Sequence, residues 1–371
     1  MANENLGNAK KAKNDEFYTQ FSDIQKEMNA YLEYNPDVFR GKTVLLPCDD
    51  PEWSNFTKYF AQNFEALGLK KLISTSYAPD SKPDAIPYQP TLFELESPGF
   101  DPEKTQTKGK IFTLEKDTTG DHVINVDDLE WSYLEGGGDF RSEEITKLRD
   151  EADIIVTNPP FSLFREFLAW LVEADKDFVI IGNKNAITYK EVFPLIRDNK
   201  MWLGSTPMSV DLLFGLPATI AAELVTSKKE GSAWRTVDGE VLGRASAVWF
   251  STLDHGRRHE PLSLMTEQDN IKFSKHKQVQ GIGYAKYDNY DAIEVPFTDS
   301  IPSDFKGVMG VPISFLSKYN PDQFEIYGCT ESEGKGFSNG LWNSHSGIAQ
   351  PVVNGSRIYK RIFIKHKQVN K

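Results

Sequence analysis

Short apolar runs alternate with amphipathic stretches through the first half of the chain. The apolar runs are four or five residues long and predict buried strands at 43–46, 72–75, 153–157 and 178–182. The amphipathic stretches place their apolar residues on one helix face and predict helices at 22–34, 54–67 and 163–174. Apolar strands separated by such helices are typical of a parallel sheet covered on both faces. The fold class is therefore α/β, and ligands are expected beyond the carboxyl ends of the strands.

The pattern changes in the second half of the chain. This half has few clear helices, many Gly, Asn and Ser residues, and short β-like runs at 247–250 and 357–364. The pattern predicts a second lobe that is mixed or rich in β-structure. Residues 205–250 could supply the last strands of the first sheet or belong to the second lobe. We place the division after residue 254, which gives domains at 1–254 and 255–371.

Composition narrows the class of protein. The chain has 371 residues, of which 39% are hydrophobic and 26% charged, so it can form a packed core. Its two cysteines, Cys48 and Cys329, exclude a disulfide scaffold and a four-cysteine zinc site, and they favour a reducing, cytoplasmic location. No apolar run approaches the roughly 18 residues that a membrane span needs, so we expect no membrane partner.

Charge is distributed unevenly along the chain. The formal net charge of −12 argues mildly against a nucleic-acid partner. Residues 1–150 hold 17 Lys and Arg against 28 Asp and Glu, whereas the stretch after Glu333 has seven Lys and Arg and no acidic residue. A polyanion could bind this last stretch while the first part of the chain repels it. The alternative is a basic tail that keeps a terminal strand soluble.

The motif that carries candidate chemistry is Asn158-Pro159-Pro160-Phe161, directly after the predicted strand 153–157. The Asn158 side-chain oxygen and the Pro159 carbonyl can both accept hydrogen bonds, and Pro160 restricts Pro159 to extended backbone. Phe161 offers a face on which a planar ring can stack. The alternative is an ordinary turn, because Asn-Pro-Pro is also common in loops. Placement between an apolar strand and an amphipathic helix favours the functional interpretation.

Two acceptors that converge on one NH2 group would activate an aromatic amine. The lone pair of such an amine is delocalised into the ring, so the amine is a poor nucleophile. Accepting both N–H hydrogens favours the pyramidal, nucleophilic form. That form can attack a sulfonium methyl directly, without a covalent enzyme intermediate. The motif therefore indicates catalysis by positioning and electrostatics, and it requires no metal.

Several segments in a fixed order resemble the EcoRI-type adenine-specific DNA methyltransferases. They are 13–20, 46–56, 138–140 and 158–161, with further blocks at 183–190 and 308–312. The resemblance runs from about Asn14 to Lys367. It implies a Rossmann-like methyltransferase sheet that uses S-adenosylmethionine, within 1–254, and a C-terminal target-recognition lobe that binds DNA, within 255–371. It also implies transfer of a methyl group to the N6 amine of a flipped-out adenine in a specific DNA sequence.

The resemblance implies a set of residues that bind S-adenosylmethionine. They are Phe17, Tyr18, Thr19, Pro47, Cys48, Asp49, Asp50, Asn55, Asp139, Phe140 and Asn158. Either Asp49 or Asp50 would pair with the amino group of the cofactor. Asp139 would accept a hydrogen bond from the adenine amine of the cofactor, and the ring of Phe140 would stack on that adenine. Phe17, Tyr18 and Thr19 match the segment that closes over the methionine end.

The second lobe would grip the DNA backbone. The candidates for phosphate contacts are Arg257, Arg258, Lys335, Arg357, Lys360, Arg361, Lys365 and Lys367. The segment 254–260 also groups His, Asp and Glu residues. Because two arginines stand among them and no cysteine lies near, a loop that touches phosphates or a plain surface loop is favoured over a metal site.

The predicted function is therefore site-specific DNA adenine-N6 methylation with double-stranded DNA as the partner. Such an enzyme belongs to restriction-modification or phage-type DNA modification, which allows a cognate restriction endonuclease acting on the same site. Two alternatives stay open. The same acceptor pair suits any planar amine, including a protein glutamine amide or an RNA adenine. The chain could also be a catalytically inactive relative that binds DNA.

Overall fold

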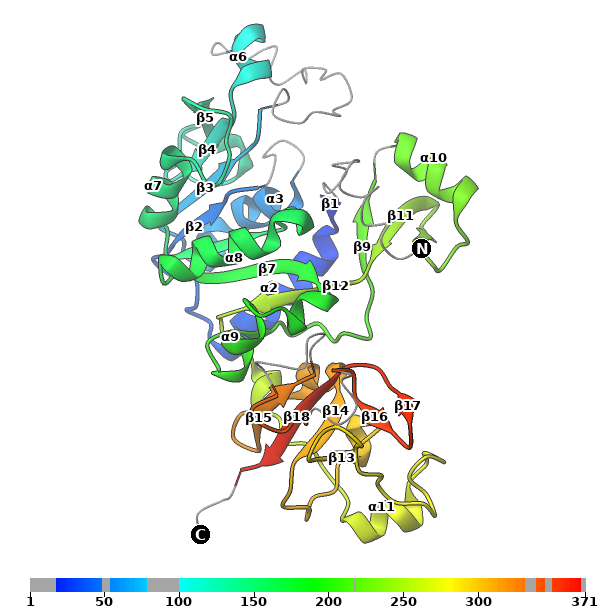
Figure 1. Ribbon diagram of the computed structural model, residues 1–371. Coiled ribbons are helices and arrows are strands. Elements are labelled where there is room, and N and C mark those ends of the chain that lie inside the picture. The colour runs from blue at the N-terminus through cyan, green and yellow to red at the C-terminus, as the bar shows by residue number, and fades with distance from the viewer. Residues whose placement is uncertain are drawn as a thin grey trace. The chain divides into compact units, whose positions relative to one another are not determined.

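The computed structural model describes residues 18–48, 54–78, 100–216, 218–330, 338–343 and 349–367. The chain forms two compact units (Figure 1). Unit 1 comprises Met1–Asn183 and Val210–Leu253, and unit 2 comprises Lys184–Ser209 and Asp254–Lys371. The chain passes from one unit to the other three times, and the division predicted after residue 254 falls one residue from the last of these points, between Leu253 and Asp254. The sequence pattern did not indicate that residues 184–209 belong with the C-terminal part of the chain.

A large sheet forms the centre of unit 1, in the order β5-β4-β3-β2-β6-β7-β12. Its strands are β2 (Thr43–Leu46), β3 (Lys71–Thr75), β4 (Lys110–Leu114), β5 (Glu130–Tyr133), β6 (Ile154–Thr157), β7 (Asp177–Asn183) and β12 (Ala247–Ser251). Strands β3, β2, β6 and β7 are parallel, whereas β4, β5 and β12 run antiparallel to their neighbours. The sheet is therefore mixed, with a parallel centre, and the predicted α/β class is confirmed.

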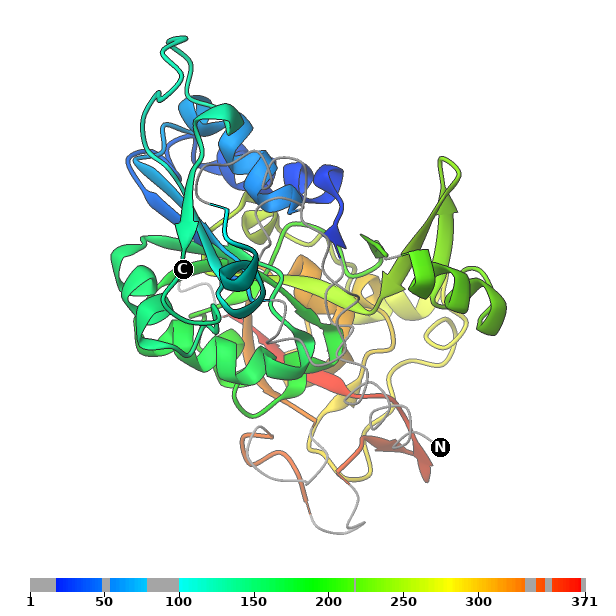
Figure 2. The ribbon, with the colours of Figure 1, turned by 90° about the horizontal axis from the view of Figure 1, so that it is seen from above.

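Helices cover both faces of this sheet. The helical segments in this part of unit 1 are α2 (Phe21–Tyr34), α3 (Asn55–Gln62), α4 (Phe64–Leu67), α6 (Pro102–Thr107), α7 (Glu143–Glu151), the 3-10 turns at Val126–Asp128 and Phe161–Leu163, and α8 (Phe164–Glu173). Helices α2 and α3 pack with alternate strand residues such as Val156 and Ile181 in one core cluster. Helix α8 lies on the other face, as Figures 1 and 2 show.

A smaller antiparallel sheet completes unit 1, in the order β1-β9-β11-β10. Its members are β1 (Tyr18–Thr19), β9 (Leu212–Gly215), β11 (Glu240–Ala245) and β10 (Trp234–Val237), with α10 (Ala218–Ser227) between β9 and β10. Residues Tyr18 and Thr19 pair with Gly215 and Phe214 of β9. This pairing holds part of the predicted cofactor segment in one backbone conformation.

Unit 2 is built on a four-stranded sheet in the order β13-β14-β18-β15. Its strands are β13 (Ile293–Glu294), β14 (Met309–Pro312), β15 (Phe324–Cys329) and β18 (Arg361–His366), with further short strands β8 (Trp202–Leu203), β16 (Val352–Val353) and β17 (Ser356–Arg357). The helical segments are α9 (Phe193–Arg197), α11 (Glu267–Phe273) and 3-10 turns at Lys184–Thr188, Gly256–His259, Thr298–Ser300 and Ile313–Lys318. The rings of Tyr287, Tyr290 and Phe363 form part of its core.

Most predicted elements are present, with two differences. The helix predicted over 54–67 is interrupted at Asn63, although Ser54 caps its start and Gly68 ends it with a φ of 64°. The run 247–250 was predicted with the second half of the chain, whereas it forms β12 in unit 1, where it pairs antiparallel with β7. Within the described part of the chain, no helix is long and apolar enough to cross a membrane.

Gly182 on β7 lets helix α8 begin close to the sheet. A Cβ atom at this position would lie 2.3 Å from Cε2 of Phe164, whose ring is buried and packs on Phe250. We expect Gly182→Ala to lower the free energy of unfolding by about 1–3 kcal/mol, because the clash forces Phe164 out of its packed position. Urea denaturation checks this. Gly136→Ala is the control, since its Cβ would meet nothing closer than 3.9 Å; an equal loss there would contradict the packing argument.

Candidate active site

The candidate site lies where the order of the central strands reverses. The chain passes from β2 outward to β3, and later from β6 outward to β7 on the other side, so β2 and β6 are neighbours at the reversal. Both strands are parallel and end at the same edge of the sheet. A crevice at such a reversal is where ligands bind in open α/β sheets. The motif Asn158–Phe161 follows the end of β6 at this point.

The motif itself is held by its surroundings. Pro159 is buried, whereas Asn158 and Phe161 are half-buried, and the ring of Phe161 packs against the core cluster of unit 1. Pro160 has extended backbone, with φ −53° and ψ 124°, and its carbonyl accepts a hydrogen bond from Leu163 N at 2.9 Å. The motif therefore turns directly into the 3-10 turn that precedes α8.

The ends of β2 and β3 meet beside this motif. Thr75 Oγ1 donates a hydrogen bond to the Pro47 carbonyl at 3.2 Å, which joins the two strand ends. Tyr77 follows β3, and burial, with the neighbouring Cys48 and Asp139, raises the pKa of its hydroxyl. Tyr77 thus brings together two residues, Cys48 and Asp139, that lie far apart in sequence and were both predicted to bind the cofactor.

A glycine loop lies against the segment after β3. Ala78 N donates to the Gly137 carbonyl at 2.9 Å. Gly138 has a φ of 82°, and a Cβ there would lie 2.1 Å from the Ser76 carbonyl oxygen. Both the left-handed backbone and the close approach require glycine at this position. The loop places Asp139 at the same edge of the sheet as the Asn158 motif.

Asp139 is held by Arg141, and Arg141 also reaches α8. The carboxylate accepts from Arg141 Nε and Nη2 at 2.9 and 2.7 Å, and Arg141 Nη1 donates to Glu166 at 3.0 Å. Hydrogen bonds from the Arg141 side chain lower the pKa of Asp139, so the group is a carboxylate at neutral pH.

Phe140 lies in the core, in a different environment from the one expected. Its ring is fully buried and packs edge-to-face against Phe167 and Trp170 of α8. This arrangement offers no open ring face for stacking on a cofactor adenine. The side chain instead fixes the loop of Asp139 to α8 through apolar packing.

The N-terminal segment and α3 are joined by a side-chain hydrogen bond. Asn55 Nδ2 donates to the Thr19 carbonyl at 2.8 Å. Thr19 is buried, and its Oγ1 has no hydrogen-bond partner among the described residues. A buried hydroxyl without a partner is costly, so Thr19 marks a position where a ligand could supply one. Phe17, Asp49 and Asp50 lie outside the described residues.

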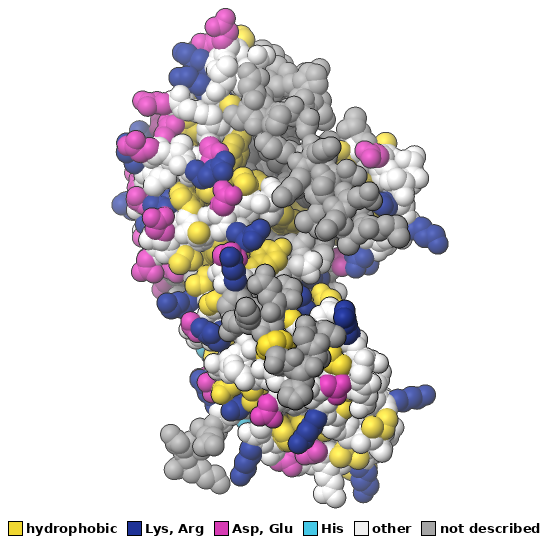
Figure 3. All heavy atoms as spheres, in the orientation of Figure 1, with side chains coloured by type: hydrophobic (Ala, Val, Ile, Leu, Met, Phe, Trp, Pro, Cys, Tyr) yellow, Lys and Arg dark blue, Asp and Glu magenta, His cyan; other side chains and the backbone are white. Residues whose placement is uncertain are grey.

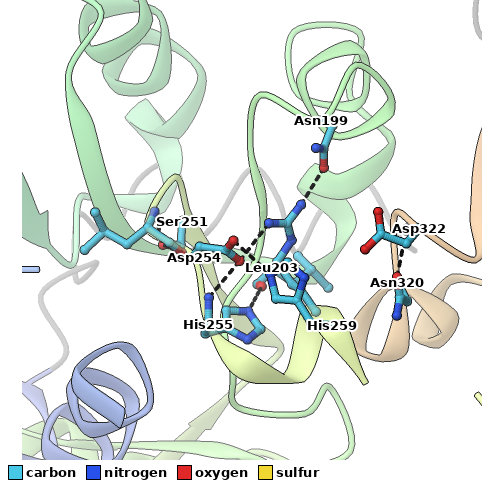
Figure 4. A network of polar contacts seen from close by, with 10 residues as sticks. Asn199, Leu203, Ser251, Asp254, His255, His259, Asn320 and Asp322 are labelled. Atoms are coloured by element: carbon cyan, nitrogen blue, oxygen red, sulfur yellow. Dashed lines mark hydrogen bonds and ion pairs between the residues drawn. The ribbon is translucent and has the colours of Figure 1, made fainter. Parts of the chain in front are cut away.

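Arg258 is buried in unit 2, and its prediction as a phosphate contact is corrected. It donates to Asp254 Oδ1 at 2.8 Å and to Asn199 Oδ1 at 2.5 Å, and its guanidinium lies 3.7 Å from the centre of the Trp202 ring. His259 also bonds Asp254, as Figure 4 shows. Burial alone would raise the pKa of Asp254, but the hydrogen bonds from His259 and Arg258 lower it. The network joins residues 199–203 to 254–259.

Arg361 is also committed to an internal ion pair, so its prediction as a phosphate contact is corrected as well. Its Nη2 lies 2.6 Å from Glu294 Oε1 and its Nε lies 3.0 Å from Oε2. Both side chains are only 12% exposed. Tyr287 donates a hydrogen bond to the same carboxylate. Arg361 therefore stabilises unit 2 and does not face a polyanion.

The remaining predicted cations differ in their surroundings. Arg357 and Lys367 are exposed. Lys360 Nζ donates to Thr188 Oγ1 at 2.8 Å, and Lys365 Nζ lies 4.2 Å from the centre of the Tyr327 ring. Lys335 lies outside the described residues. On the face that Figure 3 shows, Lys and Arg side chains are spread around unit 2, while acidic side chains gather along the outer edge of unit 1.

Unit 2 also contains a cavity that sequence reasoning missed. It has a volume of about 510 Å³ and is lined by Arg257, Lys318, Glu260 and several serines, among other residues. Arg257 Nη1 donates to the Ser205 carbonyl at 2.7 Å, which fixes its side chain at the wall. Lys318 ends a 3-10 turn far from Arg257 in sequence, so no local pattern links the two. Among the described residues, no group of three or more His, Cys, Asp or Glu side chains could hold a metal ion.

A parallel central sheet with Asn-Pro-Pro-Phe at its reversal point, and an acidic loop beside it, defines a methyltransferase that acts on a planar amine. The family described as "Adenine-specific methyltransferase EcoRI" matches residues 5–367. The chain therefore belongs to the EcoRI family of adenine-specific methyltransferases, and the predicted enzyme class, a DNA adenine methyltransferase, is confirmed.

Curated relatives match over almost their whole length. The Type II methyltransferase M.EcoRI of Escherichia coli is 40% identical over 369 residues, which cover 100% of this chain and 98% of that protein. M.MpnI of Mycoplasma pneumoniae is 34% identical over 368 residues, covering 97% of each chain. M.MgeORF184P of Mycoplasma genitalium is 32% identical over 366 residues, covering 97% and 98%. No solved structure matches the chain significantly.

Proposed function

We propose that the protein transfers a methyl group from S-adenosylmethionine to the N6 amine of an adenine flipped out of double-stranded DNA, at a specific sequence. The observation that carries this proposal is the position of Asn158 and Pro159 at the strand reversal, with the Asp139 loop at the same edge. Asn158 and Pro159 would hold the acceptor amine, and the Asp139 loop would hold the methyl donor. The printed names of the relatives, Type II methyltransferases, favour a role in restriction-modification, in which a cognate endonuclease acts on the same site.

The chain's own residues account for activation of the amine. Asn158 Oδ1 and the Pro159 carbonyl accept its two N–H hydrogens, and Phe161 stacks on the base. The extended backbone of Pro160 and the buried ring of Pro159 hold these acceptors without reorganisation during the reaction. Bases in duplex DNA must leave the stack to reach such a site.

The residues present fit S-adenosylmethionine, which supplies a sulfonium methyl when bound. Thr19 offers a buried hydroxyl without a partner among the described residues. Gly138 brings the backbone close to the strand ends without a Cβ, and Asp139 presents a carboxylate beside Tyr77. These features support a Rossmann-like cofactor site within unit 1. Asp49 and Asp50 remain candidates for the cofactor's amino group.

The proposal is tested by incubating the purified protein with methyl-labelled S-adenosylmethionine and separate DNA, RNA and protein fractions. We expect label in double-stranded DNA, and mass spectrometry of the nucleosides should identify N6-methyladenine. Long-read sequencing of DNA from expressing cells then reports the modified base with its sequence context. Label found only in RNA or only in protein would refute the DNA substrate.

Unit 2 is proposed to bind the DNA backbone through Arg257 and Lys318 at its cavity, together with exposed Arg357 and Lys367. We expect the double variant R257Q/K318Q to weaken DNA binding and to reduce the slope of log affinity against log salt by about 1.8, since each lost phosphate contact contributes roughly 0.9. Fluorescence anisotropy over a salt series measures this. K116Q/K147Q removes two charges from exposed lysines of unit 1 and is the control. If both double variants reduced the salt slope equally, the effect would come from net charge alone, and the proposed phosphate contacts of Arg257 and Lys318 would be refuted.

A further inference from the structure

We propose that Arg141 is a positioning residue for the cofactor, because it fixes the Asp139 carboxylate and anchors it to α8. This inference rests on the proposed role of Asp139 as the acceptor for the cofactor's adenine amine. It assigns a function to a residue that lies outside the sequence segments on which the resemblance rests. Arg141 stands two residues after Asp139, and α8 begins three residues after the Asn158–Phe161 motif ends.

Arg141 binds both carboxylate oxygens of Asp139, in a bidentate arrangement. Asp139 Oδ1 accepts from the Arg141 backbone N and from Nε, both at 2.9 Å, and Oδ2 accepts from Nη2 at 2.7 Å. The third guanidinium nitrogen, Nη1, donates to Glu166 Oε2 on α8 at 3.0 Å. A planar guanidinium is suited to this geometry, because its donors lie in a fixed fork.

The pattern of contacts leaves one direction for a ligand. A carboxylate has about two acceptor positions on each oxygen. Both positions on Oδ1 are used by Arg141, whereas Oδ2 has one contact with Arg141 and can accept a second donor. An exocyclic amine would therefore bind at Oδ2. The contacts with Arg141 therefore leave Oδ2 as the oxygen that can accept a hydrogen bond from the cofactor, and they keep the carboxylate from rotating.

The same contacts have little effect on overall stability. The Arg141, Asp139 and Glu166 side chains are 51%, 41% and 59% exposed, and exposed ion pairs contribute little to folding. The ring of Phe140, fully buried against Phe167 and Trp170, holds the loop in place without Arg141. A variant at Arg141 is therefore expected to fold normally, which makes its effect on ligand binding measurable.

A double-mutant cycle tests the inference on the full-length protein. Isothermal titration calorimetry measures the affinity of each variant for S-adenosylmethionine. The variants are D139N, R141A, the double variant and R141K. We expect R141A to weaken cofactor binding about tenfold or more. The double variant should bind no more weakly than D139N, because Arg141 acts only through Asp139. R141K should restore little, since an ammonium cannot engage both oxygens. Melting temperature and DNA affinity should match those of the wild-type protein throughout.

The outcomes separate the inference from the proposed function. If D139N binds the cofactor as the wild-type protein does, the proposed role of Asp139 is wrong. If D139N binds weakly but R141A binds normally, or if the two effects simply add, the role of Arg141 is overturned while Asp139 keeps its role. R40A, which breaks a similar exposed pair between Arg40 and Asp37, is the matched control and should leave affinity unchanged.

Discussion

Replacing Asn158 with alanine is expected to reduce the rate of methyl transfer by about a thousandfold, the upper range for removing one preorganised dipole from a reacting centre. Alanine leaves the target amine with a single acceptor, the Pro159 carbonyl, so its lone pair stays delocalised into the ring. Single-turnover measurements with labelled S-adenosylmethionine report the chemical step directly. Affinities for the cofactor and for DNA should change by no more than a few fold, because most of the proposed contacts to both lie elsewhere.

Asn158→Asp is the matched variant. It has nearly the same shape and keeps an acceptor oxygen at the same position, so it should retain more activity than Asn158→Ala. If alanine were tolerated, or if alanine and aspartate were equally inactive, activation of the amine by the Asn158 oxygen would be refuted. A loss of folding would be recognised by a lowered melting temperature, which separates a structural effect from a catalytic one.

The position of Asn158 could be predicted because it depends on local patterns. An apolar run such as 153–157 predicts a buried strand, and the residues after it must lie at the carboxyl edge of the sheet. The pairing of the Gly138 loop with Ser76 depends instead on contacts between segments about 60 residues apart. Strands β4 and β5 were missed because they flank an irregular polar region. The assignment of 184–209 to unit 2 likewise depends on tertiary packing alone.

Burial of charged residues was the main property that the sequence could not reveal. Arg258 has one partner nearby in sequence, Asp254, but its second partner, Asn199, lies 59 residues away. A run of basic residues looks the same whether its members face solvent or an acidic group from a distant strand. Both Arg361 and Arg357 were predicted to contact phosphates. Only the folded structure shows that Arg361 is buried in an ion pair whereas Arg357 is exposed.

Arg361→Ala is expected to lower the free energy of unfolding by about 3–5 kcal/mol, the range for breaking a buried ion pair. The substitution leaves the Glu294 carboxylate, which is only 12% exposed, without its bidentate partner. Tyr287 cannot compensate, because burial and the adjacent Glu294 hold the pKa of its hydroxyl well above the usual value and it supplies one neutral hydrogen bond. Urea denaturation followed by tryptophan fluorescence measures the loss.

Arg357→Ala is the matched control, since Arg357 is exposed on β17. It should change stability by no more than about 0.5 kcal/mol while weakening DNA binding and its salt dependence. Replacing both members of the buried pair, with Arg361→Met and Glu294→Leu, should recover much of the stability lost in Arg361→Ala, because no buried charge is then left unpaired. If Arg361→Ala were as stable as the wild-type protein but bound DNA poorly, Arg361 would contact phosphate after all, and the ion pair would be incidental.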